Sequence, residues 1–571
     1  MTHSPAGEAR GGTGRARRGT GLPRRTIGLV GRRPMAPAWL RSLTRADVAF
    51  GALLLAYGLY AAVYIYRTSF VIDGERYFTL FDDAMISMTY ARTLARGYGL
   101  VWYPGAPRVE GFTNPLWTLV MALLHLLPLP ASKMSLLVQL LAALLLVANL
   151  FLVRRVAGLI VPGSSFAGLG AVVLTAFYLP LNTWALQGME VSLLTPLITA
   201  AAYLALRVLG DRASPGWLCL LLGAGTLVRP DMAVPCLAFA SYLALADRKR
   251  WRTHLLMGLG VPALFLAAQT LLRLWYYGSP LPNTYYLKMT GFPVLLRVAR
   301  GLRVAMDFAW PIGWLIAIAG LGALALRREG QLPLLMWIFL GQVAYSVYVG
   351  GDAWEWWGGA NRYIVVAIPL LFLALTSVLA RIGAALAARL GAGGIPYAQW
   401  GLIVMAFLSM SSFAASPEGR QTPADWLLLE PPFHVQGNRD TAMIARLVTD
   451  VTATQARVAV VWAGAIPYFS ERPCVDLLGK SDARIAHLPM RLSQNPSRTS
   501  EFYPGHLKFD YGYSIGELHP DIVAQLWQAP WEAQPYLDAH YVKVNIRGFD
   551  LYLLKGSPNI LWEKTGVAAA S

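Results

Sequence analysis

Residues 81–117 have the sequence FDDAMISMTYARTLARGYGLVWYPGAPRVEGFTNPLW, and this polar stretch directly follows the first long apolar run of the chain. Apolar residues recur at helical spacing after Asp82 and Asp83, and Gly97 ends the pattern, which predicts both carboxylates at a helix N-terminus. Helix capping explains one carboxylate there. A second, adjacent carboxylate costs repulsion and desolvation unless a general base or a metal ligand is required. We therefore predict that Asp82 and Asp83 are catalytic residues.

The composition indicates a polytopic α-helical membrane protein. Of the 571 residues, 56% are hydrophobic and only 14% are charged. The net charge of +18 resides in residues 1–45, which carry +9, and in residues 46–414, which carry +11, whereas residues 415–571 carry −2. Because basic loops beside apolar spans are typical of membrane topology, this charge does not indicate a nucleic-acid partner.

Three regions are predicted from these differences. Residues 1–45 form a disordered basic cytoplasmic tail, residues 46–414 form a transmembrane catalytic domain with about eleven helices, and residues 415–571 form an extracytoplasmic mixed α/β domain. The apolar runs lie at about 47–66, 134–153, 166–186, 190–208, 215–228, 231–246, 254–276, 310–326, 332–350, 361–380 and 396–412.

The short Arg-rich loops indicate the orientation of these spans. Loops such as Arg154-Arg155, Arg248-Lys249-Arg250 and Arg381 to Arg389 all lie on one side if the N-terminus is cytoplasmic. The odd number of spans then places the C-terminal domain and the active site outside a plasma membrane. Leu116 to Leu127 is too short to cross the bilayer and is predicted as a re-entrant or surface helix.

Four further segments on the predicted outer face combine charged, aromatic and turn-forming residues. They are NTWALQGME (182–190), LVRPD (227–231), YYGSPLPNTYYLK (276–288) and GGDAWEWWGGANRY (350–363). Each has a structural explanation by itself: a helix-cap neighbour, an ion pair, tight turns and an interfacial Trp belt, respectively. Because five polar segments share one face, we predict a common outer cavity, with LVRPD at a break between two half-helices.

The same motifs, in this order, resemble those of the GT-C superfamily of membrane glycosyltransferases. The likeness covers residues from about 47 to 490 and is greatest to the mycobacterial terminal arabinofuranosyltransferase family. It also includes VEGFTNPLW (109–117), AGAIPY (463–468) and DLLGKSD (476–482). The Trp-rich loop after GGD departs from the arabinosyltransferase pattern, so the donor sugar is left open.

The resemblance implies the GT-C fold and a reaction. A sugar, in these relatives arabinofuranose, moves from a polyprenyl-phosphate donor to a cell-envelope glycan acceptor, with a first-loop carboxylate in the active site. Asp82 matches the first acid of that motif and is therefore the preferred base. The candidates for the donor phosphate are the lone cations Arg229, Lys288 and Arg362. The candidates for sugar or acceptor are Glu110, Asn114, Glu190, Asp231, Tyr285, Asp352, Trp354 and Asn361.

Two alternatives fit the same residues. A polyprenyl-phosphate hexosyl- or mannosyltransferase would keep the fold and change the sugar. A transporter of a lipid-linked sugar would be a different class, but such proteins usually contain internal repeats and polar residues at the membrane midplane, which this sequence lacks. The sequence assigns no cofactor, and a divalent cation would have Asp82 and Asp83 as its candidate ligands.

Overall fold

The computed structural model describes residues 44–353, 360–391, 393–411, 422–432, 434–493 and 499–566. Contacts divide the chain into two units, Met1–Val48 and Ala49–Ser571. The described part of the first unit begins helix α2, where the Thr44 hydroxyl accepts a hydrogen bond from the backbone N–H of Asp47. The predicted boundary between residues 414 and 415, and nearly all of the predicted tail, lie outside the described residues. The division into three domains, with its two boundaries, therefore stays a prediction.

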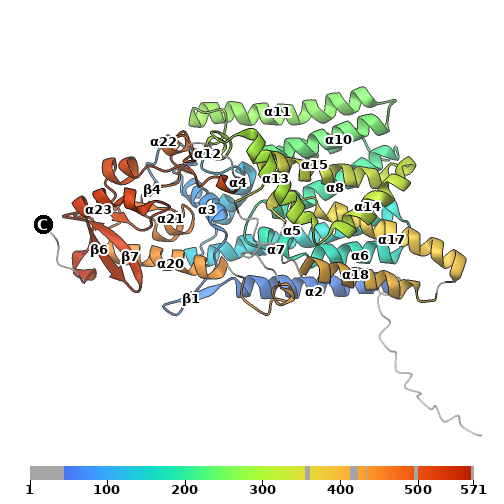
Figure 1. Ribbon diagram of the computed structural model, residues 1–571, viewed down its shortest axis with the longest axis horizontal. Helices are drawn as coiled ribbons and strands as arrows, with labels where there is room; N and C mark the ends of the chain where they lie inside the picture. Colours follow the sequence, from blue (N-terminus) through green and yellow to red (C-terminus); the bar gives the residue numbers. More distant parts are fainter. Residues whose placement is uncertain are drawn as a thin grey trace, which may run out of the picture. The chain divides into compact units, whose positions relative to one another are not determined.

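The membrane part is a bundle of helices with short connections (Figure 1). Its helices are α2 (Arg45–Arg67), α3 (Asp82–Ala95), α4 (Pro115–Leu124), α5 (Ala131–Ile160), α6 (Ser165–Ala176), α7 (Leu179–Leu186), α8 (Val191–Leu209), α9 (Pro215–Val228), α10 (Ala233–Ala246), α11 (Trp251–Tyr277), α12 (Asn283–Met289), α13 (Val294–Ala309), α14 (Gly313–Ala325), α15 (Gln331–Val349), α16 (Arg362–Val365), α17 (Ile368–Leu390) and α18 (Ile395–Ser411). A hairpin of β1 (Phe70–Ile72) and β2 (Glu75–Tyr77) follows α2.

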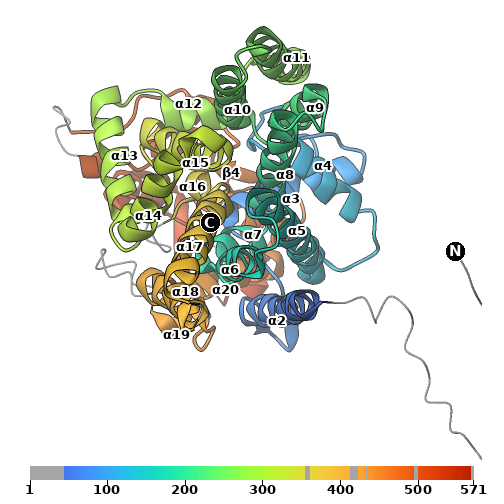
Figure 2. The ribbon, with the colours of Figure 1, turned by 90° about the vertical axis from the view of Figure 1, so that its right-hand side faces the viewer.

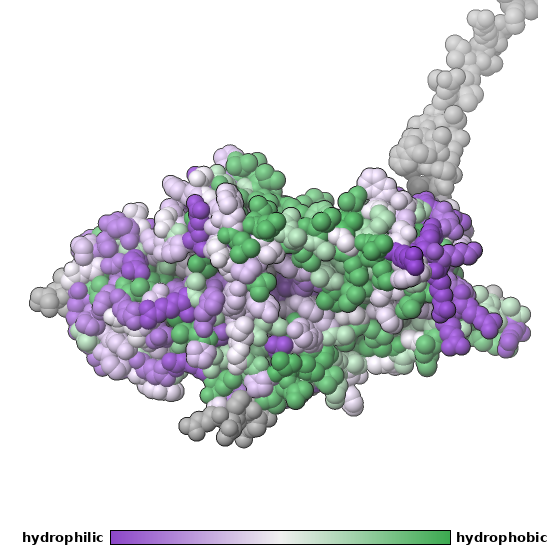
Figure 3. Space-filling view, turned by 90° about the horizontal axis from the view of Figure 1, so that it is seen from above, coloured by the Kyte–Doolittle hydropathy of each residue, from purple (hydrophilic) through white to green (hydrophobic). Residues whose placement is uncertain are grey.

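Six described helices are long and apolar enough to cross a membrane alone, and there are up to eight such segments if each of two bent helix pairs forms one span. Hydrophobic residues cover this part of the surface, whereas hydrophilic residues gather over the C-terminal domain and at the opposite end (Figure 3). The protein is therefore a multi-pass membrane protein. Nine of the eleven predicted apolar runs each contain one α-helix, and the runs at 166–186 and 361–380 contain two; because several of these helices are short, the number of eleven spans stays a prediction.

Helix α17 lies in the middle of the bundle when the molecule is viewed along its helices (Figure 2). Every residue from Ile368 to Ala380 is buried, and the helix packs against α6, α14 and α15. A helix that is apolar on all sides favours such a central position. Helix α11, at the periphery, is much less buried than α17.

One predicted span is bent and the end of another is wrong. The run at 166–186 forms two helices, α6 and α7, whose axes differ by 54° and which together are apolar and long enough for one broken span; Pro180 is the second residue of α7. The predicted loop from Arg381 to Arg389 is part of α17, since its Ala-rich sequence continues the helix to Leu390. Arg381 is accommodated there by an ion pair with Glu329.

Other expectations are confirmed. The break at Arg229 separates α9 from a short 3₁₀ turn, Pro230–Met232, and from α10, as predicted for two half-helices. Helix α4 has only 10 residues, which agrees with the prediction that it is too short to span the membrane. Helices α12 and α13 are not predicted from the sequence. Helix α12 follows the turns at 278–282 and places Lys288 on a helix rather than in a loop.

The C-terminal region contains a mixed five-stranded sheet, as expected for an α/β domain. The strand order is β4-β3-β5-β7-β6, with β4 (Cys474–Asp476), β3 (Val458–Val460) and β5 (Ile522–Val523) parallel and β7 (Phe549–Leu554) and β6 (Tyr541–Ile546) antiparallel. Its helices are α19 (Pro423–Trp426), α20 (His434–Val451), α21 (Ala465–Ser470), α22 (Ala483–Ala486) and α23 (Gln534–His540). This region also contains a π-helix at Gly512–Glu517 and short 3₁₀ helices at Thr499–Glu501, Pro530–Glu532 and Trp562–Lys564; a further 3₁₀ helix, Arg327–Glu329, connects α14 and α15 in the membrane part.

The C-terminal sheet is joined to the membrane part through α3 and α21. Arg92 of α3 donates to the backbone carbonyls of Pro467 and Tyr468 at α21. Arg92 and Arg96 also pair with Glu471, at 3.1 and 2.8 Å. Since α3 begins at the two predicted catalytic aspartates, this interface brings the C-terminal region to the site.

Candidate active site

A cavity of about 250 Å³ lies between the membrane helices and the C-terminal region. Its described lining includes eight of the predicted site residues: Asp83, Asn114, Glu190, Arg229, Asp231, Tyr285, Lys288 and Arg362. Asp82, Glu110, Asp352 and Asn361 are not among the lining residues. Trp354 lies outside the described residues. The prediction of one shared cavity is thus confirmed in its geometry, whereas the roles of the residues stay predictions.

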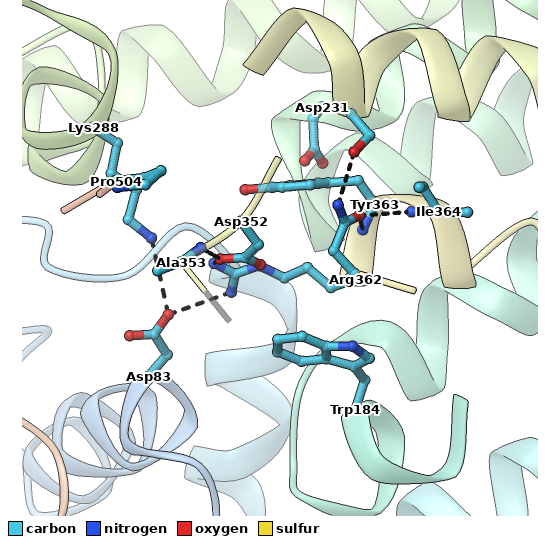
Figure 4. A network of polar contacts seen from close by, with 12 residues as sticks. Asp83, Trp184, Asp231, Lys288, Asp352, Ala353, Arg362, Tyr363, Ile364 and Pro504 are labelled. Carbon is cyan, nitrogen blue, oxygen red and sulfur yellow. Dashed lines mark hydrogen bonds and ion pairs between the residues drawn. The ribbon is translucent and has the colours of Figure 1, made fainter. Parts of the chain in front are cut away.

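Asp83 is surrounded by three cations, Lys480, Arg362 and Lys288; Figure 4 shows the contacts with Arg362 and Lys288. Its Oδ1 lies 2.8 Å from Lys480 Nζ, and its Oδ2 lies 3.4 Å from Arg362 Nη1 and 3.9 Å from Lys288 Nζ. Burial by itself would raise the pKa of this carboxyl, but the charges of Lys480, Lys288 and Arg362 outweigh burial and hold the pKa well below its usual range. Asp83 is therefore an ionised carboxylate that faces the cavity.

Asp82 has a different environment. Its Oδ1 accepts hydrogen bonds from the backbone N–H groups of Gly464 and Ala465, at 3.0 and 3.1 Å. Its buried Oδ2 has no hydrogen-bond partner among the described residues and lies 4.0 Å from Lys480 Nζ. Burial raises the pKa of Asp82, and Lys480 offsets part of this effect. Asp82 thus fastens the start of α21 to the start of α3.

Neither aspartate caps α3. The N-cap position is Phe81, and the helix has no side-chain cap. The simple capping explanation for the aspartate pair is therefore wrong for α3, although Asp82 does bind the first N–H groups of the neighbouring helix α21. Gly464 is required at this contact, because a Cβ there would collide with the backbone oxygen of Asp82.

Arg362 is fixed by residues behind the cavity. Its Nε lies 2.7 Å from Oδ2 of the buried Asp352, and its guanidinium lies over the ring of Trp184 (Figure 4). Asn361 caps α16 by accepting hydrogen bonds from two backbone N–H groups, those of residues 363 and 364. Asp352 and Asn361 therefore position Arg362, and neither lies on the cavity wall.

Lys288 lies on the short helix α12, one turn after Tyr285, and both residues line the cavity. Burial lowers the pKa of Lys288 to about 8, although Asp83 favours its charged form. The buried Lys508 holds α12 in place by donating hydrogen bonds to the carbonyls of Tyr286 and Ala486 and to the Thr290 hydroxyl. The C-terminal region thus determines where this cation lies.

Arg229 is engaged by two carboxylates. It makes a bidentate contact with Asp231, with a shortest distance of 2.7 Å, and its Nη1 lies 2.5 Å from Oε1 of Glu190. The other carboxylate oxygen of Glu190 accepts a hydrogen bond from Asn114. Arg229 therefore has two carboxylates within 2.7 Å, whereas Arg362 has one at that distance, Asp352, and a second, Asp83, at 3.4 Å.

The sequence analysis assigned no role to two cations that line the cavity. Arg273 lies in the membrane-spanning helix α11, and its Nε donates to the buried Glu110 at 2.7 Å. An Arg in an otherwise apolar helix is a signal of function that could have identified it. Glu110 therefore acts as the partner of this Arg and does not line the cavity.

The second is Lys480, which the sequence analysis included in the motif DLLGKSD but gave no role. The carboxylate of Asp476 folds this loop by accepting hydrogen bonds from the backbone N–H groups of Leu478, Gly479 and Ser481. Gly479 has a positive φ of 76°, which the turn requires. The loop directs Lys480 to Asp83, from a position about 400 residues later in the chain.

The donor set around the aspartates does not fit a resident divalent cation. Within the described ranges, no group of three His, Cys, Asp or Glu side chains could hold a metal ion. Moreover, three cationic side chains surround Asp83, and they would repel a metal ion there.

Comparisons with known proteins agree with this architecture. ArnT from Cupriavidus metallidurans in the apo state is similar over 89% of this chain and 98% of that chain, with 13% identity and a TM-score of 0.53. The Archaeoglobus fulgidus oligosaccharyltransferase in complex with Zn and sulfate is similar over 88% of this chain and 73% of that chain, with 12% identity and a TM-score of 0.51.

Sequence comparisons give less information about this chain than the structural comparisons do. Residues 433–556 match a family described as "Domain of unknown function (DUF8728)". No curated protein matches the chain. At these identities the structural likeness concerns the fold alone. The chain therefore has the GT-C fold with a C-terminal mixed α/β domain, as the sequence predicts.

Proposed function

We propose that the protein transfers a sugar from a polyprenyl-phosphate donor to a cell-envelope glycan on the outer face of the membrane. The observation that carries this proposal is one cavity in which the carboxylate of Asp83 faces the cations Lys288, Arg362 and Lys480. The cavity lies at the end of the membrane helices, where the phosphate of a lipid donor and a polar acceptor could meet.

The chemistry of such a transfer matches these residues. A polyprenyl phosphate is a good leaving group that is stabilised by cations, whereas the acceptor hydroxyl needs a base. Lys288 and Arg362 supply positive charge, and Asp83 supplies a carboxylate that is ionised at neutral pH. Arg273 also lies on the cavity wall, but its Nε is paired with Glu110, so it is not assigned to the phosphate.

We assign the role of base to Asp83 and an anchoring role to Asp82. Asp83 lines the cavity, whereas one oxygen of Asp82 is already bound by two backbone N–H groups. This assignment reverses the preference for Asp82 that came from the resemblance alone. Arg229 is assigned a structural role because Glu190 and Asp231 neutralise it.

Arabinofuranose is the proposed sugar, on the basis of the motif resemblance to the terminal arabinofuranosyltransferases. A hexosyl or mannosyl donor is the alternative with the same machinery, since the cations contact only the phosphate. The sugar itself would lie against residues such as Asn114 and Tyr285, which line the same cavity.

The test is a transfer assay with purified protein in lipid nanodiscs. Polyprenyl-phosphate arabinofuranose and polyprenyl-phosphate mannose are supplied in parallel with a synthetic envelope oligosaccharide, and products are identified by mass spectrometry. We expect one pentose to be added from the first donor. A hexose product would support the alternative sugar, and no transfer from either donor would refute the proposal.

A transporter would behave differently. In proteoliposomes it would move the labelled lipid-linked sugar between leaflets without forming a glycosylated product. The control is Asp83→Asn, which should abolish transfer and would have no reason to abolish movement between leaflets. Movement without transfer by the wild-type protein would favour the transporter class.

A further inference from the structure

The two oxygens of Asp83 are held by different parts of the chain. Oδ1 contacts Lys480, which belongs to the C-terminal region, at the hydrogen-bonding distance of 2.8 Å. Oδ2 contacts Arg362 and Lys288, which belong to the membrane part, at the longer distances of 3.4 and 3.9 Å. The short contact of Asp83 is therefore made by the C-terminal region, and its two longer contacts are made by the membrane part.

Lys480 is firmly fixed. Its side chain is 4% exposed, and its loop is folded around the buried Asp476. From the membrane part, Asn283 donates through its side-chain nitrogen to the carbonyls of residues 479, 480 and 482. Gly111 approaches the same loop so closely that a Cβ there would collide with the hydroxyl of Ser481. Such a residue is suited to holding a partner in one place.

Lys288 and Arg362 are bound less tightly to Asp83 than Lys480 is. Lys288 has a side chain that is 23% exposed, and its nearest carboxylate is 3.9 Å away. Arg362 keeps its Nε on Asp352, so its Nη1 is the atom that points to Asp83 and the cavity. The singly charged phosphodiester of the donor would compete with Asp83 for these two cations, because charge-assisted contacts to phosphate are strong.

We propose that Lys480 is a positioning residue that holds Oδ1 of Asp83, so that Oδ2 becomes the base once the donor phosphate has taken Lys288 and Arg362. This inference rests on the proposed function. In the reaction, Oδ2 accepts the proton of the acceptor hydroxyl while the acceptor oxygen forms a bond to the anomeric carbon. The bond between the anomeric carbon and the phosphate oxygen breaks, and its electron pair leaves with the phosphate.

The inference gives a role to the domain of unknown function. That domain supplies Lys480, which orients Asp83, and the N–H groups of α21, which bind Asp82. The membrane part supplies the aspartates and the cations for the phosphate. The active site is complete only when both parts are present.

The experiment compares Lys480→Met and Lys480→Arg in the nanodisc assay, with the pH dependence of kcat/KM for the acceptor measured at saturating donor. Loss of the ammonium should lower kcat/KM by about 10²-fold and move the acid limb to higher pH by about one unit, since a nearby cation lowers the pKa of a carboxylate. The KM for the donor should change less than about threefold. Lys480→Arg should keep the acid limb near its wild-type position.

Lys543→Met is the control, because Lys543 forms an exposed ion pair with Asp550 on the β6–β7 hairpin of the same domain. It should change neither the rate nor the pH profile. If Lys480→Met does not fold, Lys480→Gln takes its place, since it too removes the charge.

The outcomes separate this inference from the proposed function. An acid limb in the neutral variant that coincides with that of the wild type overturns the role of Lys480. A tenfold rise in donor KM with an unchanged acid limb overturns it too and makes Lys480 a phosphate ligand. If the wild-type protein transfers no sugar at all, the proposed function fails and the inference fails with it.

Discussion

Adjacent aspartates at the start of α3 differ in environment because successive residues on a helix point in different directions. Asp82 points towards the backbone of α21, whereas Asp83 points into the cavity and towards three cations. Their carboxyl pKa values shift in opposite directions for this reason. Such a separation of two carboxyl groups is a common arrangement at sites of acid–base chemistry.

Replacing each aspartate by Asn should distinguish their roles. Asp83→Asn should lower turnover by about 10²–10⁴, the usual contribution of general acid–base catalysis, with little loss of thermal stability. Asp82→Asn keeps an oxygen that can accept from Gly464 and Ala465, so a milder loss is expected. Measuring the turnover and the melting temperature of both variants in detergent distinguishes a catalytic role from an anchoring role. Near-normal turnover by Asp83→Asn would exclude it as the base.

Lys288 should impose a basic limit on donor binding. Its pKa is about 8, so it is mostly charged at pH 7 and becomes neutral as the pH rises through 8. The KM for the donor should therefore increase above pH 8, by up to tenfold for each further pH unit if the charge is required. The matched variant is Lys288→Arg, whose charge persists at high pH, and it should remove this increase. A donor KM that is independent of pH between 7 and 9.5 would contradict the role of Lys288.

The sequence identifies several residues of the site, but it does not show which of the two aspartates faces the cavity. The pairing of Asp82 with Asp83, and the cations Lys288 and Arg362, stand out because each is a polar residue without a local structural need. The contacts that separate the aspartates come from residues 464 and 480. No local pattern reports a contact across almost 400 residues, so the sequence ranks the two aspartates equally.

At the scale of elements, ion pairs between charged side chains stabilise the break between α9 and α10. Arg229 closes the end of α9, Asp231 opens the next turn, and Glu190 reaches them from the start of α8. Three helix ends thus meet at one cluster of opposite charges beside the cavity. The prediction of two half-helices succeeded because Pro230 and the charges are local signals.

Arg229→Met should therefore affect folding more than donor binding. The change leaves the buried carboxylates of Glu190 and Asp231 without their cation, which costs about 3–5 kcal/mol for a buried ion pair that loses one partner. We expect a lower melting temperature in detergent and a donor KM within about threefold of wild type. The triple variant with Glu190→Gln and Asp231→Asn should recover part of the stability. A stable Arg229→Met protein with weak donor binding would instead make Arg229 a phosphate ligand.

Elements without strong local signals were missed. Helix α12 has only seven residues and follows two prolines, so its sequence resembles a turn-rich loop. Its position depends on Lys508 and Asn283, whose partners are distant in the sequence. The central helix α17 was predicted, but its C-terminal end was placed too early, because Arg381 interrupts the apolar run and is neutralised only by Glu329 from another element.

For the whole molecule, orientation in the membrane is the prediction most open to test. The Arg-rich loops place the N-terminus in the cytoplasm, and an odd number of spans places the C-terminus outside. A reporter that is active only in the cytoplasm should be silent when fused after Ser571 and active when inserted after Arg250. Activity at Ser571 would refute both the odd count and the external C-terminal domain.

The buried Lys508 limits whether the C-terminal domain can be exchanged independently of the membrane part. Among the described residues, this ammonium donates hydrogen bonds to three oxygens: the Tyr286 carbonyl and the Thr290 hydroxyl at α12, and the Ala486 carbonyl at the end of α22. Because Lys508 belongs to the C-terminal region, separation from α12 would leave its charge with one of these three hydrogen bonds, at a cost of several kcal/mol. Exchange of the C-terminal domain between relatives should therefore succeed only when α12 is exchanged with it. In this protein, helix α12 and the C-terminal domain must therefore be exchanged together.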